Sequence, residues 1–152
     1  MEKIDSFRGD YYFLSNFYEI PVTYDGLTYR NNEAAFQAQK CINPKDRTQF
    51  TMLNASEAKH LGRKVNLRSN WEQIKISEMT RIVQAKFKQH KDLADKLITT
   101  KDAYLEEGNT WGDKIWGTVN SKGANLLGKI LMQVREELIR DKDLDEEEEE
   151  ER

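Results

Sequence analysis

Cysteine, proline and long apolar runs are scarce in this chain. Cys41 is its single cysteine, and Pro21 and Pro44 are its two prolines. One cysteine excludes an internal disulfide, and no apolar run approaches the roughly 20 residues that a membrane-spanning helix needs. The opening residues, Met-Glu-Lys-Ile-Asp, also lack the apolar core of a signal peptide. We therefore expect a cytoplasmic protein without a membrane partner.

Sequence signals for metals and common cofactors are missing as well. His60 and His90 are isolated, and no Cys or His lies at the spacing of metal ligands. The chain has no phosphate-binding glycine loop, nucleophile elbow or zinc-protease signature. We expect no metal site and no cofactor, and the large enzyme classes that these motifs mark are disfavoured.

Charge is divided unevenly along the 152 residues. The net charge is -3, but residues 141–152 alone carry nine acids and two basic residues, which leaves +4 on residues 1–140. That mild excess suits a phosphate-bearing small molecule and is far below the basic load of a duplex-DNA binder. The acidic run repels itself and has nothing apolar to bury. We expect one domain over 1–140 and a disordered tail over 141–152.

Apolar spacing predicts a mainly helical (α+β) fold with a small β-hairpin near the N-terminus. Asp25-Gly26, between alternating flanks, predicts the two-residue turn of that hairpin. In the longest predicted helix, 71–90, the apolar stripe is Ile76, Met79, Val83 and Phe87, with Lys75 and Lys86 at its edge to contact phosphate or extend into solvent. Further helices are predicted over 32–41, 56–62, 92–99 and 102–107, followed by a long last helix with Leu127, Leu131, Val134 and Leu138 as its apolar stripe.

The predicted helix over 32–41 places three polar side chains on one face. On a helical wheel, Glu33, Gln37 and Lys40 fall within a sector of about 60°. Alanine and other apolar residues cover most of the remaining surface, which is typical of a buried helix. Buried charges need partners, and a rise of roughly 10 Å from Glu33 to Lys40 suits a sugar-sized ligand. The alternative is a surface helix whose Glu33 and Lys40 face water.

Two more segments concentrate polar and aromatic side chains. The segment 107–117 has no helical periodicity and suits a binding wall, because glycines allow close approach and indoles stack on flat groups. A tight turn with its tryptophans in the core is the competing interpretation. Ser15-Asn16 likewise fits a cap or turn as well as a binding site. The first segment holds Glu107, Asn109, Trp111, Gly112, Asp113, Trp116 and Gly117.

Taken in order, these motifs resemble the NADAR family, also called YbiA-like. The similarity extends from about Phe7 to Leu138 and departs at Thr99-Thr100-Lys101, where relatives commonly have Thr-Gly. The acidic tail lies outside it. The motifs are Phe13-Leu14-Ser15-Asn16-Phe17-Tyr18, Glu33-Ala34-Ala35-Phe36-Gln37-Ala38-Gln39-Lys40, Trp71, Glu107-Gly108-Asn109, Asp113-Lys114-Ile115-Trp116-Gly117, and Asn125-Leu126-Leu127-Gly128-Lys129-Ile130-Leu131-Met132 with Arg135.

The resemblance implies a single, mainly α YbiA-like domain that cleaves N-glycosidic bonds on ribose. The implied substrates are phosphoribosylamino-pyrimidine intermediates of riboflavin synthesis or, alternatively, ADP-ribose on guanine, in nucleotides or in nucleic acid. A third interpretation is an ADP-ribose- or nucleotide-binding module without turnover. The sequence does not determine the oligomeric state.

The chemistry of ribosyl transfer suggests roles for individual residues. Cleavage of the C1–N bond builds positive charge on the sugar, which a carboxylate of Glu33 or Asp113 would stabilise. Lys40 has two roles open to it, as an ammonium that binds phosphate or protonates the leaving group, or as a neutral amine that attacks C1. Expected substrate contacts are Ser15, Asn16, Phe17, Gln37, Trp71, Glu107, Asn109, Trp111, Trp116, Gly117 and Asn125.

Overall fold

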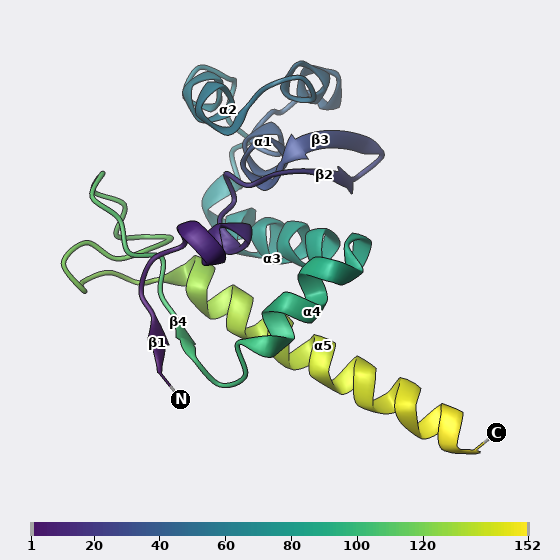
Figure 1. Ribbon diagram of the computed structural model, residues 1–152. Helices are drawn as coiled ribbons and strands as arrows, with labels where there is room; N and C mark the ends of the chain where they lie inside the picture. The colour runs from purple at the N-terminus through teal and green to yellow at the C-terminus, as the bar shows by residue number, and fades with distance from the viewer. Residues whose placement is uncertain (1, 152) are drawn as a thin grey trace. The chain divides into compact units, whose positions relative to one another are not determined.

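The structure is a computed structural model that describes residues 2–151 (Figure 1). It is 55% helical with a few short strands, which confirms the predicted mainly α class. Its contacts form two compact units, which are described separately. One is Arg8–Gln89, and the other combines the residues up to Phe7 with those from His90 onward. Among residues 2–151, no helix is long and apolar enough to cross a membrane.

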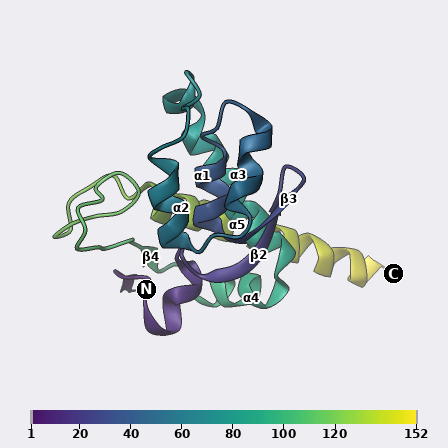
Figure 2. The same cartoon turned by 90° about the horizontal axis from the view of Figure 1, so that it is seen from above.

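The predicted hairpin is present in the unit Arg8–Gln89. Strand β2, Glu19–Tyr24, pairs antiparallel with β3, Leu27–Asn31. Asp25 and Gly26 both have positive φ, as a two-residue turn of this kind requires. The hairpin lies beside helices α1 (Asn32–Ala38) and α3 (Trp71–Gln89), as Figure 2 shows. Its buried face therefore belongs to the core of this unit.

Helix α1 lies between α2 (Ala55–Gly62) and α3 (Figure 1). Two short 3₁₀ helices, η1 (Gly9–Leu14) and η2 (Pro44–Phe50), complete this unit and were not predicted. Helix α2 begins one residue earlier than expected, because Asn54 and Glu57 form a capping box in front of it. Every residue of α1 is buried, which sets the surroundings of its polar side chains.

The buried face of α3 differs from the predicted stripe. Ile76 is 46% exposed, whereas Ile82 and Lys86 are buried together with the expected Met79. Lys86 lies seven residues after Met79, two helical turns along the same face. The prediction that Lys86 lies at the edge of the stripe is therefore wrong, and a lysine occupies a core position.

The second unit contains β1 (Lys3–Ile4), α4 (Lys91–Thr99), β4 (Tyr104–Leu105) and α5 (Leu126–Glu151). Strands β1 and β4 pair in parallel. The helix predicted over 102–107 does not form, because these residues turn after α4 and β4 pairs with the N-terminal strand instead. Lys101 makes that turn with a positive φ.

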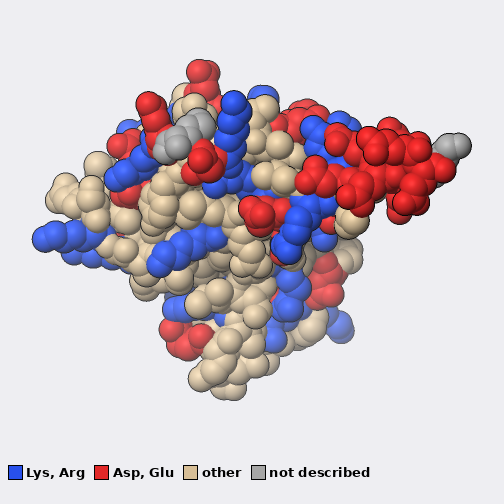
Figure 3. All heavy atoms as spheres, turned by 90° about the horizontal axis from the view of Figure 1, so that it is seen from below, with Lys and Arg blue, Asp and Glu red and all other residues tan. Residues whose placement is uncertain are grey.

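The acidic segment does not behave as the sequence suggested. Helix α5 continues through residues 141–151, although we expected disorder there; residue 152 lies outside the described residues. Glutamate is a good helix former, and extending an existing helix costs far less than nucleating one. Figure 3 shows the acidic side chains gathered on this extension, where every residue is exposed.

Candidate active site

Helix α1 begins at a strong cap. The Asn31 side chain accepts a hydrogen bond from the Ala34 N–H at 2.7 Å and donates to Glu19 Oε2 and to the Leu53 carbonyl. The Glu33 N–H, which a helix start leaves without an intrahelical partner, donates to the Asn16 carbonyl at 3.0 Å. Glu33 is thus fixed in the first turn, where its side chain is 9% exposed.

The helix ends earlier than predicted, at Ala38, and a tighter turn follows. The N–H groups of Gln39 and Lys40 donate to carbonyls three residues back, to Phe36 and Gln37. A turn of this type advances about 120° per residue, so Lys40 still falls on the side of Glu33 and Gln37. The one-faced arrangement therefore persists although Lys40 is no longer part of the helix.

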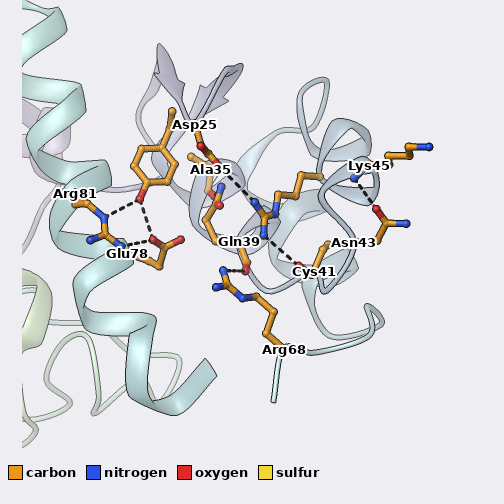
Figure 4. A network of polar contacts seen from close by, with 11 residues as sticks. Asp25, Ala35, Gln39, Cys41, Asn43, Lys45, Arg68, Glu78 and Arg81 are labelled. Carbon is orange, nitrogen blue, oxygen red and sulfur yellow. Dashed lines mark hydrogen bonds and ion pairs between the residues drawn. The ribbon is translucent and has the colours of Figure 1, made fainter. Parts of the chain in front are cut away.

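A neighbouring segment holds the end of α1 in place. Arg68 donates from its guanidinium to the Gln39 carbonyl at 3.3 Å, which Figure 4 shows, and from its main chain to the Lys40 carbonyl at 2.9 Å. The Gln39 side chain turns back to the Ala35 carbonyl at 3.0 Å. Sequence reasoning missed Arg68, because its contacts join segments that are distant along the chain.

Lys40 has the electrostatic surroundings of a reactive amine. Burial lowers the pKa of Lys40, and the positive charges of Arg63 and Lys75 lower it further. The Glu33 carboxylate acts in the opposite direction and raises it. A half-buried lysine with a lowered pKa beside a carboxylate is typical of catalytic sites.

Gln37 completes the polar face and carries an unusual atom. Its side chain is 6% exposed, and its buried Oε1 has no hydrogen-bond partner among the described residues. Gly62 of α2 lies directly against this amide, because a Cβ at Gly62 would collide with it. An unpartnered buried oxygen is a group that a bound ligand or water could satisfy.

Ser15, Asn16 and Phe17 form a turn before the hairpin. The Ser15 hydroxyl accepts a hydrogen bond from the Phe17 N–H at 3.0 Å. The side chain of Asn16 is buried and contacts Met79 Sδ at 3.4 Å. The Ser15 hydroxyl therefore has the turn-forming role considered as the alternative, whereas the Asn16 side chain binds within the core. Substrate contacts of both residues stay a prediction.

Trp71 serves the core beneath α1. Its ring is buried and packs on Phe36 with 5.1 Å between the ring centroids. The expected contact of Trp71 with substrate gains no support from this packing and stays a prediction. Trp71 is the first residue of α3 and lies on the buried face of that helix. Its large apolar surface explains this burial.

The segment 107–117 in the other unit is organised by its own side chains. Asn109 accepts a hydrogen bond from the Asp113 N–H and donates to the carbonyls of Glu107 and Asp113 and to the Glu107 carboxylate. Asp113 Oδ1 in turn accepts the N–H groups of Ile115 and Trp116 at 3.0 and 2.9 Å. Asn109 and Asp113 thus shape this loop, whatever else they bind.

The tryptophans of the segment 107–117 differ in burial from Gly117 and from Asn125, which follows the segment. Trp111 is 54% exposed and Trp116 is half-buried, so neither indole is anchored in the core as the competing interpretation required. Gly117 is buried where a Cβ would collide with Glu107. Asn125 is also buried, where it accepts from the Glu107 N–H and donates to the Leu105 carbonyl. A structural role for Asn125 is therefore evident, and substrate binding by these residues stays a prediction.

The predicted site residues thus fall into two sets. Glu33, Gln37 and Lys40 share one face in the unit Arg8–Gln89, together with the turn at Ser15. Asp113 and its loop belong to the other unit. Within residues 2–151, no group of His, Cys, Asp and Glu side chains is arranged to hold a metal ion.

Comparison with known proteins identifies the family. A model described as the NADAR domain matches residues 5–139. N-glycosidase YbiA of Shigella boydii serotype 4 (strain Sb227) is 39% identical over 137 residues, which cover 88% of this chain and 85% of that protein. A riboflavin biosynthesis protein of Vibrio vulnificus (strain YJ016) is 38% identical over 132 residues, 83% of this chain but 35% of that longer protein.

A solved structure agrees with these sequence matches. The NMR structure of the Escherichia coli protein YbiA superposes with a TM-score of 0.82 at 37% identity, covering 93% of this chain and 89% of that one. The curated relatives named N-glycosidase support an enzyme that hydrolyses N-glycosyl bonds. The chain belongs to the NADAR domain family.

Proposed function

We propose that this protein hydrolyses the bond between ribose and a base in a phosphoribosylamino-pyrimidine, with Lys40 and Glu33 as the reacting groups. The observation that carries the proposal is the half-buried Lys40 amine. Burial lowers the pKa of this amine, and the nearby Glu33 carboxylate partly offsets that by raising it. An amine of this kind is available as a nucleophile nearer neutral pH than a solvated lysine.

The phosphate of such a substrate has candidate partners beside Lys40. Arg63 and Lys75 lie close enough to Lys40 to lower its pKa, and both can donate charge-assisted hydrogen bonds to phosphate. Lys75 is paired with Glu72 at 2.7 Å. The name of the Vibrio vulnificus relative, a riboflavin biosynthesis protein, supports this substrate class.

Of the two roles open to Lys40, the neutral amine fits the chemistry better. An ammonium beside the developing positive charge at C1 would be repelled by it. In the proposed route, the neutral Nζ attacks C1, the C1–N bond to the base breaks, and the base leaves with a proton given up by Nζ. The bond between C1 and the ring oxygen then breaks, the remaining Nζ proton passes to that oxygen, and a Schiff base forms between C1 and Nζ. Water then adds to C1, and cleavage of C1–Nζ releases ribose phosphate and restores the amine.

Glu33 is the carboxylate proposed for this reaction. Its negative charge would stabilise the positive charge at C1 and on the Schiff base, and it can accept the proton of the attacking water. Asp113 is a weaker candidate, because its Oδ1 already accepts two main-chain hydrogen bonds within its loop. Gln37, with its unpartnered Oε1, is the proposed hydrogen-bond partner of a ribose hydroxyl.

The test is release of a base from both substrate classes. Purified protein is incubated with a phosphoribosylamino-pyrimidine or with ADP-ribosylated guanosine, and the products are identified by mass spectrometry. We expect release from the first, which Glu33→Gln and Lys40→Met abolish and the exposed-site control Lys88→Met retains. Release from ADP-ribosylated guanosine alone would transfer the proposal to that substrate. Binding without release by folded protein would instead indicate a binding module.

A further inference from the structure

Lys86 is a buried lysine that the proposed chemistry does not use. Its side chain is 1% exposed, and its Nζ donates to the Phe13 carbonyl at 2.6 Å and to the Ser15 carbonyl at 3.1 Å. The amine also lies over the rings of Tyr18 and Phe87, 5.4 and 5.3 Å from their centroids. Burying a lysine is costly, so these contacts indicate a specific role.

The contacts of Lys86 lead by short steps to Glu33. Lys86 fixes the main chain of the segment 13–15, and within the same turn the Ser15 hydroxyl accepts the Phe17 N–H. Asn16, between these two residues, presents its carbonyl to the Glu33 N–H at the first turn of α1. One amine on α3 thus holds the turn that supports the residue proposed to stabilise charge at C1.

We infer that Lys86 is a positioning residue, which fixes the turn 13–17 so that this turn holds Glu33 in its reactive place. The inference rests on the function proposed for Glu33. Lys86 does not contact substrate in this role, since its amine is enclosed and directed at two main-chain carbonyls. Burial lowers the pKa of Lys86 to about 7, while the two carbonyls and two ring faces favour its charged form.

Substitution by methionine separates this role from simple packing. Lys86→Met keeps an unbranched side chain that is only one atom shorter, but it removes the donor shared by the Phe13 and Ser15 carbonyls. We expect kcat to fall roughly 10- to 100-fold, because small displacements of a reacting group have effects of that size, and KM to change by a smaller factor. Lys86→Arg, which keeps donors, should recover part of kcat. The matched control Lys88→Met, exposed on the same helix, should leave both constants unchanged.

Hydrogen exchange gives a measurement that does not depend on activity. The amides of Phe17 and Glu33 should be protected in the unsubstituted protein and should exchange faster in Lys86→Met than in Lys88→Met, beyond any general loss of stability. The inference would be overturned if these two amides exchanged no faster in Lys86→Met than in Lys88→Met, or if folded Lys86→Met had the kcat of the unsubstituted protein. So would unprotected Phe17 and Glu33 amides in the unsubstituted protein, a result that remains decisive if Lys86→Met does not fold. Absence of base release by the unsubstituted protein would contradict the proposed function instead.

Discussion

The main-chain N–H of Arg68 donates to the carbonyl of Lys40 at 2.9 Å, so the backbone of the proposed nucleophile is fixed by a segment distant along the chain. Lys40 lies two residues beyond the last residue of α1, and the residues at the end of a helix often fray. The Ile42 N–H makes a second such bond, to the Asn66 carbonyl. A firmly placed backbone lets burial and neighbouring charges act consistently on the Lys40 amine.

The pH dependence of turnover should reveal the role of Lys40. Below its pKa the amine carries a proton and cannot attack C1, so activity should rise with pH through a pKa that burial places below the usual lysine value of 10.5. The measurement is kcat against pH for the purified protein. An ammonium role predicts the opposite slope, a fall in kcat as pH rises through the same pKa.

A change at Arg63 gives this pH profile an internal check. The positive charge of Arg63 lowers the pKa of Lys40, so Arg63→Gln should move the rising limb of the kcat profile to higher pH. The shift should be small and should shrink in high salt, because Arg63 is exposed. If the rising limb of the Arg63→Gln profile lies at the same pH as that of the unsubstituted protein in low salt, the limb reports the titration of a group other than Lys40.

The cap of α1 should make a measurable contribution to stability. Asn31→Ala removes the acceptor of the Ala34 N–H and the donor to Glu19 and Leu53. We expect the free energy of unfolding to fall by about 1–2 kcal/mol, as for other lost N-caps. Urea unfolding of Asn31→Ala beside Asn70→Ala, an exposed asparagine, checks this; equal midpoints for the two variants would contradict it.

The close approach of Gly62 to Gln37 predicts a coupled pair of substitutions. Gly62→Ala forces a methyl group against the Gln37 amide, and we expect it to destabilise the protein by about 1–3 kcal/mol. In a Gln37→Ala background the obstacle is gone, so the same Gly62→Ala change should cost clearly less. A double-mutant cycle in urea measures the coupling. If the losses in the free energy of unfolding from Gly62→Ala and Gln37→Ala simply add in the double variant, contact between the new methyl group and Gln37 is not the cause of the destabilisation.

Glycine at position 101 should make the protein more stable. Its φ is +56°, in the left-handed region that favours glycine, just after the C-cap of α4. Lys101→Gly should therefore raise the free energy of unfolding by about 1 kcal/mol. Lys101→Ala, which keeps a Cβ, is the matched control and should bring little gain. If alanine stabilises as much as glycine, backbone strain is not the cause.

Local patterns predicted the parts of the fold that depend on local chemistry. Asp25-Gly26 specifies its turn through positive φ values, and the apolar spacing of α5 appears as buried Leu127 and Leu131. The predicted helix over 102–107 failed because β4 instead pairs with a strand about 100 residues earlier in the chain. Such long-range pairing leaves no periodic trace in a short segment.

The site was predicted to a similar extent. The one-faced placement of Glu33, Gln37 and Lys40 follows from helical periodicity, and the structure retains it. The supports of that face are less visible in the sequence, because Arg68 binds main-chain carbonyls of a distant segment and Lys86 resembles a surface lysine. The position of Lys86 two turns after Met79, on the same face of α3, was the sequence signal that could have indicated its burial.

Mass spectrometry after borohydride reduction tests the central claim most directly. Protein incubated with a phosphoribosylamino-pyrimidine and then reduced should carry one added ribose phosphate unit, located at Lys40 by peptide mapping. Lys40→Met should carry none and should release no base. Rapid base release without any adduct at Lys40, combined with wild-type turnover by Lys40→Met, would contradict the account.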